Sequence, residues 1–217
     1  MIFQKNFDKL RKKEVIKISK KRIWYPGAIY HIMGRGNRHM DIFTDEEDRE
    51  YFLALLEDIN GKYPFVIHSY CLMTNHYHIL IETKENEIWH IMQRLLLNYT
   101  KYYNRKYNKD GHLFKGRYKA CIVENDEYFL QTSRSIHLNP VRAKMIGYPQ
   151  DYKWSSYKTM IGMEDQRIVE REKILSYFKK PREQEYQRFV EDVSINFRQQ
   201  ELEIQKMIGE DDLWLPW

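Results

Sequence analysis

The segment TNHYHILIE, residues 74–82, decides how this chain is expected to fold. Side chains two residues apart on a strand point to the same face of a sheet. His76 and His78 would therefore present two imidazoles side by side, and neutral imidazoles are ligands for divalent metal ions. Three residues of the segment would face the opposite way, into a core: Tyr77, Ile79 and Ile81. The pair predicts a metal site, and the alternative is that two of eight histidines fall two apart by chance.

The chain combines a basic main body with an acidic end. Its 217 residues are enough for one domain with extensions, or at most two domains, and a hydrophobic content of 42% can build a core of ordinary size. Residues 164–217 hold 13 acidic and 9 basic side chains, so the net charge of +5 divides into −4 there and +9 on residues 1–163. A basic body favours a polyanionic partner, and the alternative is an ordinary basic cytosolic protein.

The two cysteines, Cys71 and Cys121, lie 50 residues apart and outside any Cys-x-x-Cys pair. This spacing argues against a disulfide scaffold and a cysteine-rich zinc site, and it favours small buried thiols. No apolar run approaches the roughly 18 residues that a membrane span needs, and the N-terminus lacks the apolar segment of a secretory signal. We therefore expect a cytoplasmic protein.

Four segments have strand character. Turn residues bound them, and the second and third are close enough to form a hairpin around Met73 and Thr74. Within the first segment, alternation puts Ile29, His31 and Met33 on one face. We expect strands over residues 28–33, 64–73, 75–83 and 113–123.

Three helices are expected between and after these strands. Asp45 can cap the first helix, which Gly61 ends, and Asn86 can cap the second. Asn125 can cap the third, which runs to about residue 138 and is closed by Pro140. The order strand, helix, strand, strand, helix, strand, helix is the ferredoxin-like pattern of an α+β fold plus one helix. We therefore predict an antiparallel sheet with helices packed on it.

Two extensions flank the expected main domain, residues 24–163. The first, residues 1–23, is basic and could be a flexible arm or a short amphipathic helix. The second, residues 164–217, is acidic and has apolar residues at helical spacing. A helix from residue 183 to residue 207 is expected within it.

Arginines and lysines gather in two places. The glycines beside Arg35 and Arg38 would let backbone and guanidinium groups approach a phosphate closely. Lys115, Arg117 and Lys119 alternate on one face of the fourth expected strand, where an anion or solvent must balance them. The alternatives are an incidental loop and a solvent-facing edge strand. For phosphate contacts with a nucleic acid we select Arg35, Asn37, Arg38, Lys115, Arg117 and Arg142.

A catalytic metal site needs a third protein ligand and open coordination positions. The third expected helix ends with Ser135 and Asn139 four residues apart, hence on one face. That face could lie beside the two histidines, and Asn139 would add an oxygen to two nitrogens. His137 competes as a ligand but points away by helical periodicity. Such a donor set suits Mg²⁺ or Mn²⁺ better than structural zinc.

Five segments together resemble the single-tyrosine HUH transposases of the insertion-sequence-200-like type, in the branch of the REP-associated tyrosine transposases. The resemblance covers about residues 24–160 and follows the predicted order of strands and helices. The segments are 24–31 (WYPGAIYH), 35–37 (RGN), 75–78 (NHYH), 113–119 (LFKGRYK) and 136–143 (IHLNPVRA).

The resemblance implies a protein of the nucleoid that binds single-stranded or hairpin DNA at the ends of mobile or repeated elements. His76, His78 and Asn139 match the metal-ligand positions, and the metal acts as a Lewis acid on the scissile phosphate. The family cleaves and rejoins DNA, because a helix tyrosine four residues before the third ligand attacks to give a 5′-phosphotyrosine. Family members are often homodimers.

The chain departs from the family at the nucleophile, where it has Ser135. A serine hydroxyl lies about 4 Å closer to its backbone than a tyrosine hydroxyl and should fall short of the phosphate. Tyr128 would be ~10 Å from Ser135 along the helix and ~16 Å from Asn139, too far for a simple replacement. Three readings remain: a DNA-binding descendant that lost cleavage, an inactivated variant, or attack by Ser135, Tyr128 or a partner's tyrosine in an altered geometry. An RNA-binding ferredoxin-like module is a remote alternative.

Overall fold

The computed structural model describes residues 24–192, in which four strands form one antiparallel sheet. Its strand order is β2-β3-β1-β4, the ferredoxin-like arrangement, and this confirms the predicted α+β fold. The strands are β1 (Ile29–Arg35), β2 (Phe65–Leu72), β3 (His76–Thr83) and β4 (Lys119–Ile122).

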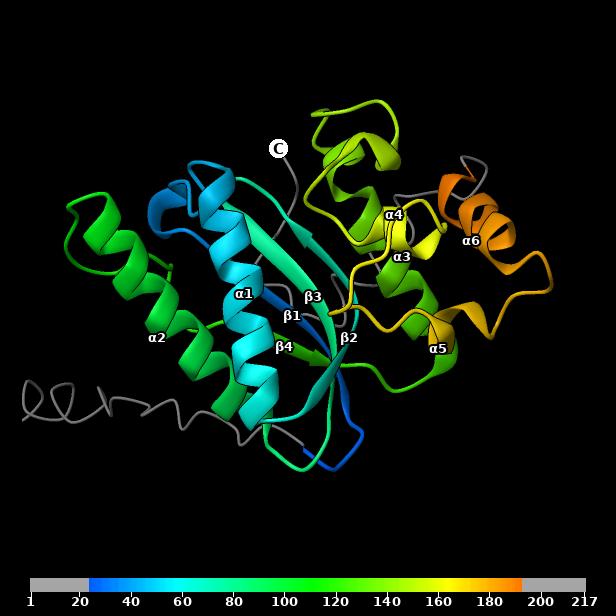
Figure 1. The fold of residues 1–217 in the computed structure, drawn as a ribbon, viewed down its shortest axis with the longest axis horizontal. Helices are drawn as coiled ribbons and strands as arrows, with labels where there is room; N and C mark the ends of the chain where they lie inside the picture. The colour runs from blue at the N-terminus through cyan, green and yellow to red at the C-terminus, as the bar shows by residue number, and fades with distance from the viewer. Residues whose placement is uncertain (1–23, 193–217) are drawn as a thin grey trace, which may run out of the picture.

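One face of the sheet carries the larger apolar core. Tyr77, Ile79 and Ile81 of β3 are buried on it, as the alternation predicted. Helices α1 (Glu46–Lys62) and α2 (Ile88–Lys106) cover this face and lie side by side in Figure 1. Their long stripes of aromatic and aliphatic side chains therefore serve packing.

The opposite face carries the histidines and a second core. Helix α3 (Asp126–Arg142) packs across β2 and β3 here, on the right of the sheet in Figure 1. Cys71 and Leu80 from the sheet meet Phe129 and Ile136 from the helix in one buried cluster. Burial raises the pKa of the Cys71 thiol well above its ordinary value, so this thiol is a packing group, as its sequence setting indicated.

The helix caps follow the sequence at two of three positions. Asp45 accepts a hydrogen bond from the Asp48 N–H (3.0 Å) in a capping box, and Asn125 accepts one from the Tyr128 N–H (2.8 Å). Asn86 was the wrong choice for α2, because the chain is still extended at Glu87, which is the N-cap.

Two predicted boundaries were wrong. β4 begins at Lys119 and not near residue 113, because Gly116 has a φ of +126° and breaks the extended run. Lys115 and Arg117 are therefore exposed loop residues and do not share a strand face with Lys119. α3 continues past Pro140 to Arg142, since a proline removes only one N–H donor and the next turn keeps its bonds.

The chain after α3 returns to the sheet. It contains α4 (Tyr157–Met160), α5 (Glu172–Leu175) and α6 (Arg182–Glu191), together with short 3₁₀ turns at Asn37–His39 and Pro149–Asp151. The Glu170 N–H donates to the Ile67 backbone oxygen (2.8 Å), which attaches this segment to the edge strand β2.

The single helix expected over residues 183–207 was wrong in its length, because α6 ends at Glu191 and Asp192 has an extended backbone. The rest of that range and the basic extension over residues 1–23 lie outside the described residues. Within residues 24–192 no helix combines the length and apolar character needed to cross a membrane.

Candidate functional site

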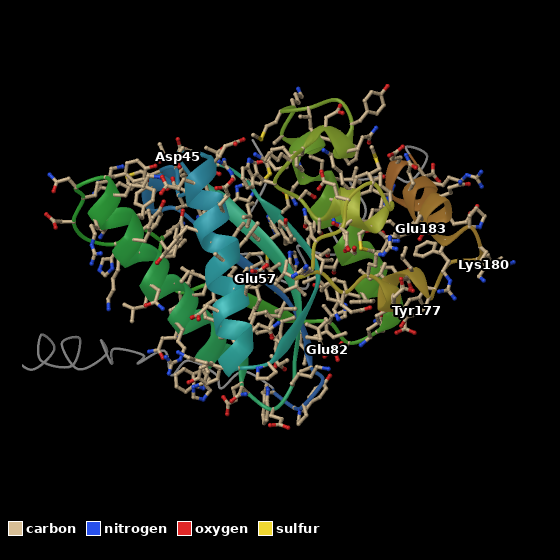
Figure 2. The ribbon with its side chains drawn as sticks, in the orientation of Figure 1. Asp45, Glu57, Glu82, Tyr177, Lys180 and Glu183 are labelled. Atoms are coloured by element: carbon tan, nitrogen blue, oxygen red, sulfur yellow. The ribbon has the colours of Figure 1, made fainter. Side chains whose placement is uncertain are left out.

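β3 brings His76 and His78 to the sheet face that α3 covers. Their ring centroids are 5.2 Å apart and the rings are nearly perpendicular, at 88°. His78 is buried and His76 is half-buried. Figure 2 shows Glu82 at the far end of the sheet from Asp45, so the first residues of β3 lie at the end where α1 begins.

Asn139 reaches His76 from α3, so the structure brings these two distant segments together. Burial lowers the pKa of His76 to about 4, and a hydrogen bond with the Asn139 side chain opposes that shift. The Asn139 Nδ2 donates to the Ser135 backbone oxygen at 3.1 Å. The second N–H of this amide and its carbonyl oxygen remain for the imidazole, and the oxygen is the atom that could bind a metal ion.

A third imidazole, that of His31 on β1, lies behind the pair. Its Nε2 is 3.0 Å from the His78 Nδ1, and the two ring centroids are 5.2 Å apart. Burial lowers the pKa of His31 to about 4 and that of His78 well below its ordinary value. All three rings are therefore uncharged at neutral pH, the form that binds metal ions.

Alternation along the first expected strand assigned His31 to a sheet face but predicted no role for it. The missing signal was the register between β1 and β3, which pairs Met33 with His78 and so brings His31 close to the His78 ring. Alternation along one strand cannot supply that information, because register depends on the partner strand.

The donor set fits a hard divalent ion. In the described part of the chain, no three His, Cys, Asp or Glu side chains are arranged to hold a metal ion. The Asn139 amide, which is in contact with His76, offers an oxygen beside the two imidazoles. Two neutral nitrogens, one amide oxygen and open positions are compatible with Mg²⁺ or Mn²⁺.

Two loops pair to form a short basic ribbon: residues 35–38 and 113–117. The Asn37 N–H donates to the Leu113 oxygen (2.8 Å), and the Lys115 N–H donates to the Arg35 oxygen (3.0 Å). The ribbon contains four of the cations selected from the sequence, of which the first is half-buried and the others are exposed: Arg35, Arg38, Lys115 and Arg117.

The basic ribbon is attached directly to the histidine strand. The Gly36 N–H donates to the backbone oxygen of Asn75 at 2.8 Å, and Asn75 precedes His76. A Cβ at position 36 would collide with the Met40 backbone oxygen, so the close approach requires glycine. The exposed cations of the ribbon therefore lie beside the histidine end of β3.

Ser135 and Arg142 complete the α3 side of the site. The Arg142 Nη1 donates to the Ser135 Oγ at 3.0 Å. Burial, the two neighbouring imidazoles and the Arg142 charge together lower the pKa of His78, so this guanidinium lies near the histidines. The Ser135 hydroxyl is thus hydrogen-bonded to a cation.

Two other candidates lie away from the histidine pair. Tyr128 is buried in the second core, where burial and the nearby Cys121 raise the pKa of its phenol above the ordinary value. His137 bonds to the Tyr186 hydroxyl (2.7 Å) and the Ser156 hydroxyl (2.9 Å), away from the histidine pair as periodicity predicted.

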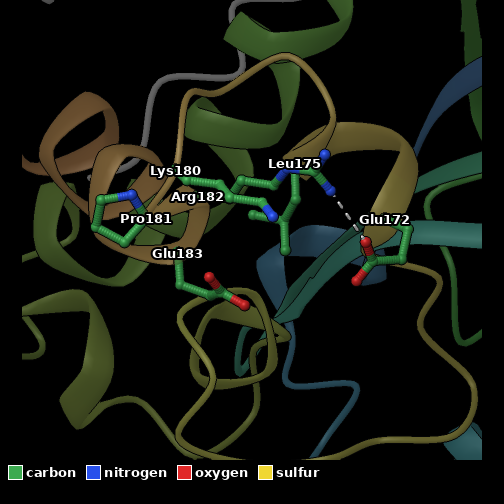
Figure 3. Close-up of a pocket in the computed structure, with 6 residues that line it drawn as sticks. All are labelled: Glu172, Leu175, Lys180, Pro181, Arg182 and Glu183. Atoms are coloured by element: carbon green, nitrogen blue, oxygen red, sulfur yellow. Dashed lines mark ion pairs between the residues drawn. The ribbon is translucent and has the colours of Figure 1, made fainter.

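The cavity drawn in Figure 3 belongs to another part of the molecule. It has a volume of about 570 Å³ and lies between α5 and α6. None of the residues selected from the sequence lines it. Arg182 on its wall pairs with Glu172 at 3.6 Å, so its charges are balanced within the chain. It is not the candidate site.

The comparisons with known proteins place the chain in a family. A family model described as transposase IS200 like matches residues 25–138. A solved REP-associated tyrosine transposase bound to a REP hairpin is similar, with a TM-score of 0.56, 13% identity, and coverage of 70% of this chain and 96% of that chain. A candidate transposase from Deinococcus radiodurans has a TM-score of 0.38 and 16% identity over 62% of this chain and 97% of that chain. No curated protein matches.

The family match and the fold match carry different information. At 13% identity the hairpin-bound structure supports the fold alone. The family match spans more than half of the chain and includes both histidines and Ser135, ending one residue before Asn139. The chain therefore belongs to the family of IS200-like transposases.

Proposed function

We propose that this chain binds single-stranded or hairpin DNA at a site where His76, His78 and Asn139 hold Mg²⁺ or Mn²⁺. The observation that carries the proposal is the contact between Asn139 on α3 and His76 on β3, next to the basic ribbon. The similar REP-associated transposase is bound to a hairpin, which supports the same class of partner here.

In this proposal one group of residues binds the DNA phosphates, and another group orients a single phosphate at the metal site. The basic ribbon and Arg142 neutralise phosphates, so binding weakens steeply as salt rises. The neutral imidazoles and the amide oxygen orient one phosphate group. A bound divalent ion supplies Lewis-acid polarisation of that phosphodiester. The phosphate-binding set is Arg35, Asn37, Arg38, Lys115, Arg117 and Arg142.

Strand cleavage is absent in this proposal because of Ser135. The serine side chain is short, so its hydroxyl lies close to the α3 backbone. That hydroxyl also accepts a hydrogen bond from the Arg142 guanidinium of the same helix (3.0 Å). Tyr128, the nearest tyrosine of α3, is buried. The chain therefore acts as a DNA-binding member of its family that retains the metal site. The second candidate is an active strand transferase in which Ser135 attacks.

A covalent-adduct assay separates these candidates. Hairpin-bearing single-stranded DNA labelled on the 3′ side of the expected nick, in the fragment whose 5′ phosphate would be joined to the protein, is incubated with the protein and Mn²⁺, then resolved under denaturing conditions. We expect no adduct from the natural chain and an adduct from Ser135→Tyr. A metal-dependent adduct from the natural chain would overturn the loss of cleavage.

The matched control combines Ser135→Tyr with His76→Ala, which removes a ligand and should abolish the adduct. Hairpin binding by the natural chain should survive His76→Ala with reduced affinity, because the basic ribbon is unchanged. No adduct from Ser135→Tyr, with no Mn²⁺ binding, would count against the metal site itself.

Two further parts of the proposal can be tested with the purified chain and hairpins: the preference for DNA over RNA, and the number of protein copies in the complex. We infer a nucleoid-associated cytoplasmic protein that prefers DNA hairpins over RNA hairpins of the same sequence. Stronger binding to RNA would favour a ferredoxin-like RNA-binding module. We also propose that the chain forms a homodimer. A light-scattering mass of one protein chain in the hairpin complex would contradict the dimer.

A further inference from the structure

We propose that the outward side of helix α2 is a second DNA surface, which binds single-stranded DNA that continues beyond the histidine site. This surface rests on the proposed function and adds a place for the flanking strand. Five residues of α2 form it, and we call them the α2 row: His90, Arg94, Leu97, Lys101 and Arg105.

The charge of α2 fits a polyanionic partner. Its 19 residues include four cations and no acidic side chain, whereas the neighbouring α1 has six acidic and two basic residues. Lys106 is occupied within the chain, because Asp45 and Asp48 approach its Nζ to 2.8 and 3.0 Å. Lys101 and Arg105 are exposed, and neither forms an ion pair with another residue in the described part of the chain. Phosphates can therefore pair with both cations.

The spacing of the α2 row places its members on one side of the helix. They follow one another at steps of 4, 3, 4 and 4 residues, which keep side chains in line along a helix surface. Leu97 lies between the cations and is 53% exposed. The row therefore alternates positive charge with apolar surface. Single-stranded DNA offers the matching pair of groups, phosphates and unpaired bases.

The row begins at an exposed aromatic stack. Trp89 and His90 stack with ring centroids 3.7 Å apart, and the Tyr63 ring is nearly parallel to that of His90, at 6.0 Å and 6°. The Arg94 guanidinium lies 4.7 Å from the centre of the Tyr63 ring. Trp89 stays 42% exposed, so an unpaired base can stack on it. Bases inside a duplex cannot do so, and the row therefore favours a single strand over the hairpin stem.

The other end of the row adjoins the basic ribbon. The Asn104 side chain donates to the Gly111 oxygen (3.2 Å), and the Lys109 N–H donates to the Asn104 oxygen (2.9 Å). The chain then enters the basic ribbon at residue 113. α2 and the histidines lie on opposite sheet faces, so a strand held at the histidines would reach α2 by passing the ribbon.

The length of the row sets the length of DNA needed to test it. Trp89 and Arg105 are 16 residues apart, which is ~24 Å along the helix at the left edge of the molecule in Figure 1. Only a flank of several nucleotides can cover that distance. A short flank would end at the basic ribbon, and a long flank would reach Trp89.

Hairpin affinity as a function of flank length provides the test. The probes are a blunt DNA hairpin and the same hairpin with oligothymidine flanks of about 12 nucleotides, titrated with the full chain by fluorescence anisotropy. The flanks should tighten binding at least about tenfold. Lys101→Gln with Arg105→Gln should remove most of this gain and lower the salt slope by about 0.7 for each lost phosphate contact. Equal affinity of the natural chain for both probes would overturn the α2 surface.

Trp89 tests the stacking part of the surface. Trp89→Ala should weaken binding of the flanked probe about tenfold, and Trp89→Phe should restore much of it because a phenyl ring still stacks. Both variants should bind the blunt hairpin like the natural chain. Equal affinity of Trp89→Ala and the natural chain for the flanked probe would overturn base stacking at Trp89.

The matched control for the charge change is Lys179→Gln with Lys180→Gln. This variant removes the same charge from exposed positions between α5 and α6. It should keep the gain from the flanks. If it lost as much affinity as the α2 variant, net charge alone would explain the result, and the α2 surface would be overturned. Circular dichroism checks that each variant is folded.

The two proposals fail differently. If the α2 variant keeps the full gain from the flanks, the α2 surface is overturned and the proposed function stands. If the natural chain binds no hairpin, the proposed function fails, and oligothymidine alone still tests the row. Weaker oligothymidine binding by the α2 variant than by the matched control would support the row. Equal binding would overturn it and leave this side of α2 to an acidic protein partner.

Discussion

Helix α3 has two polar faces that are built differently. On the face toward the histidines, the bonds of Ser135 join it to neighbours in its own helix, Asn139 and Arg142. On the face toward α6, Ser133 and His137 both bond to the Tyr186 hydroxyl, each at 2.7 Å. Local bonds beside a half-buried histidine can be exchanged for bonds to a ligand. Bonds to a distant buried segment hold the structure together.

The α6 face is reinforced by a buried arginine. Arg134 donates from Nε to the Val190 backbone oxygen at 3.2 Å and from Nη2 to the Asp192 oxygen. A cation at these carbonyls stabilises the C-terminal end of α6. The returning segment therefore determines where α3 lies on the sheet, and so where Asn139 lies relative to His76. Polar residues on one side of α3 thus belong to the candidate site beside the histidines, and polar residues on its other side hold α6 in place.

Acidification should give the largest effect, because both faces adjoin buried neutral histidines. The pKa is lowered by burial to about 4 for His31, beside the site, and to about 3 for His137, toward α6. At pH values between the ordinary histidine pKa and these lowered values, these histidines are protonated in the unfolded chain but not in the folded chain. The free energy of unfolding should therefore fall on the order of a few kcal/mol as pH drops from about 6.5 to 5.

Urea denaturation in a chelator at pH 8.0, 7.5, 6.5, 5.8 and 5.0 measures this slope. Above pH 7 the histidines are neutral in both states, so the curve should be flat there and serves as the internal control. The window ends above the carboxylate range, so acidic residues do not dominate it. Equal stability at pH 7.5 and 5.0 would show that the histidines are not shielded as described.

Tyr186→Phe tests the α6 face and should have the next largest effect. Losing the hydroxyl leaves Ser133 and His137 without their shared buried partner, which should cost about 1–3 kcal/mol of unfolding free energy. Affinity for a DNA hairpin should change little at temperatures where the variant is folded. Chemical denaturation measures the unfolding free energy of the variant, and titration with a DNA hairpin measures its affinity.

Tyr177→Phe is the matched control for that change. The Tyr177 hydroxyl, labelled in Figure 2, bonds to Asp126 at 2.7 Å but is exposed to solvent. Water can replace its bond, so its loss should cost well below 1 kcal/mol, roughly. Equal losses in the two variants would mean that the α6 face is not the scaffold.

The sequence predicted what local patterns encode. Alternation placed Tyr77 and His78 on opposite sheet faces, and side-chain caps at Asp45 and Asn125 located two helix starts. The spacing of four between Ser135 and Asn139 also held, because helix geometry alone fixes it.

What the sequence missed depends on contacts between distant segments. The length of β4 was wrong because the φ of Gly116 is a property of the folded loop. The proximity of His31 to His78 needed the strand register. The bonds of Tyr186 to α3 join residues about 50 positions apart, and no local period marks them.

Ser135→Ala should have the smallest effect and tests whether the site face is truly exchangeable. Removing Oγ deletes one bond from Arg142, but Ser135 is half-buried and water can take its place. We expect a loss near 0.5 kcal/mol in unfolding free energy, roughly, with hairpin affinity unchanged because Arg142 still meets the phosphate. Arg142→Ala in the same titration should weaken binding and lower its salt dependence. If Ser135→Ala instead destabilised the fold as much as Tyr186→Phe, both faces of α3 would be structural, and neither would exchange its hydrogen bonds for bonds to a ligand.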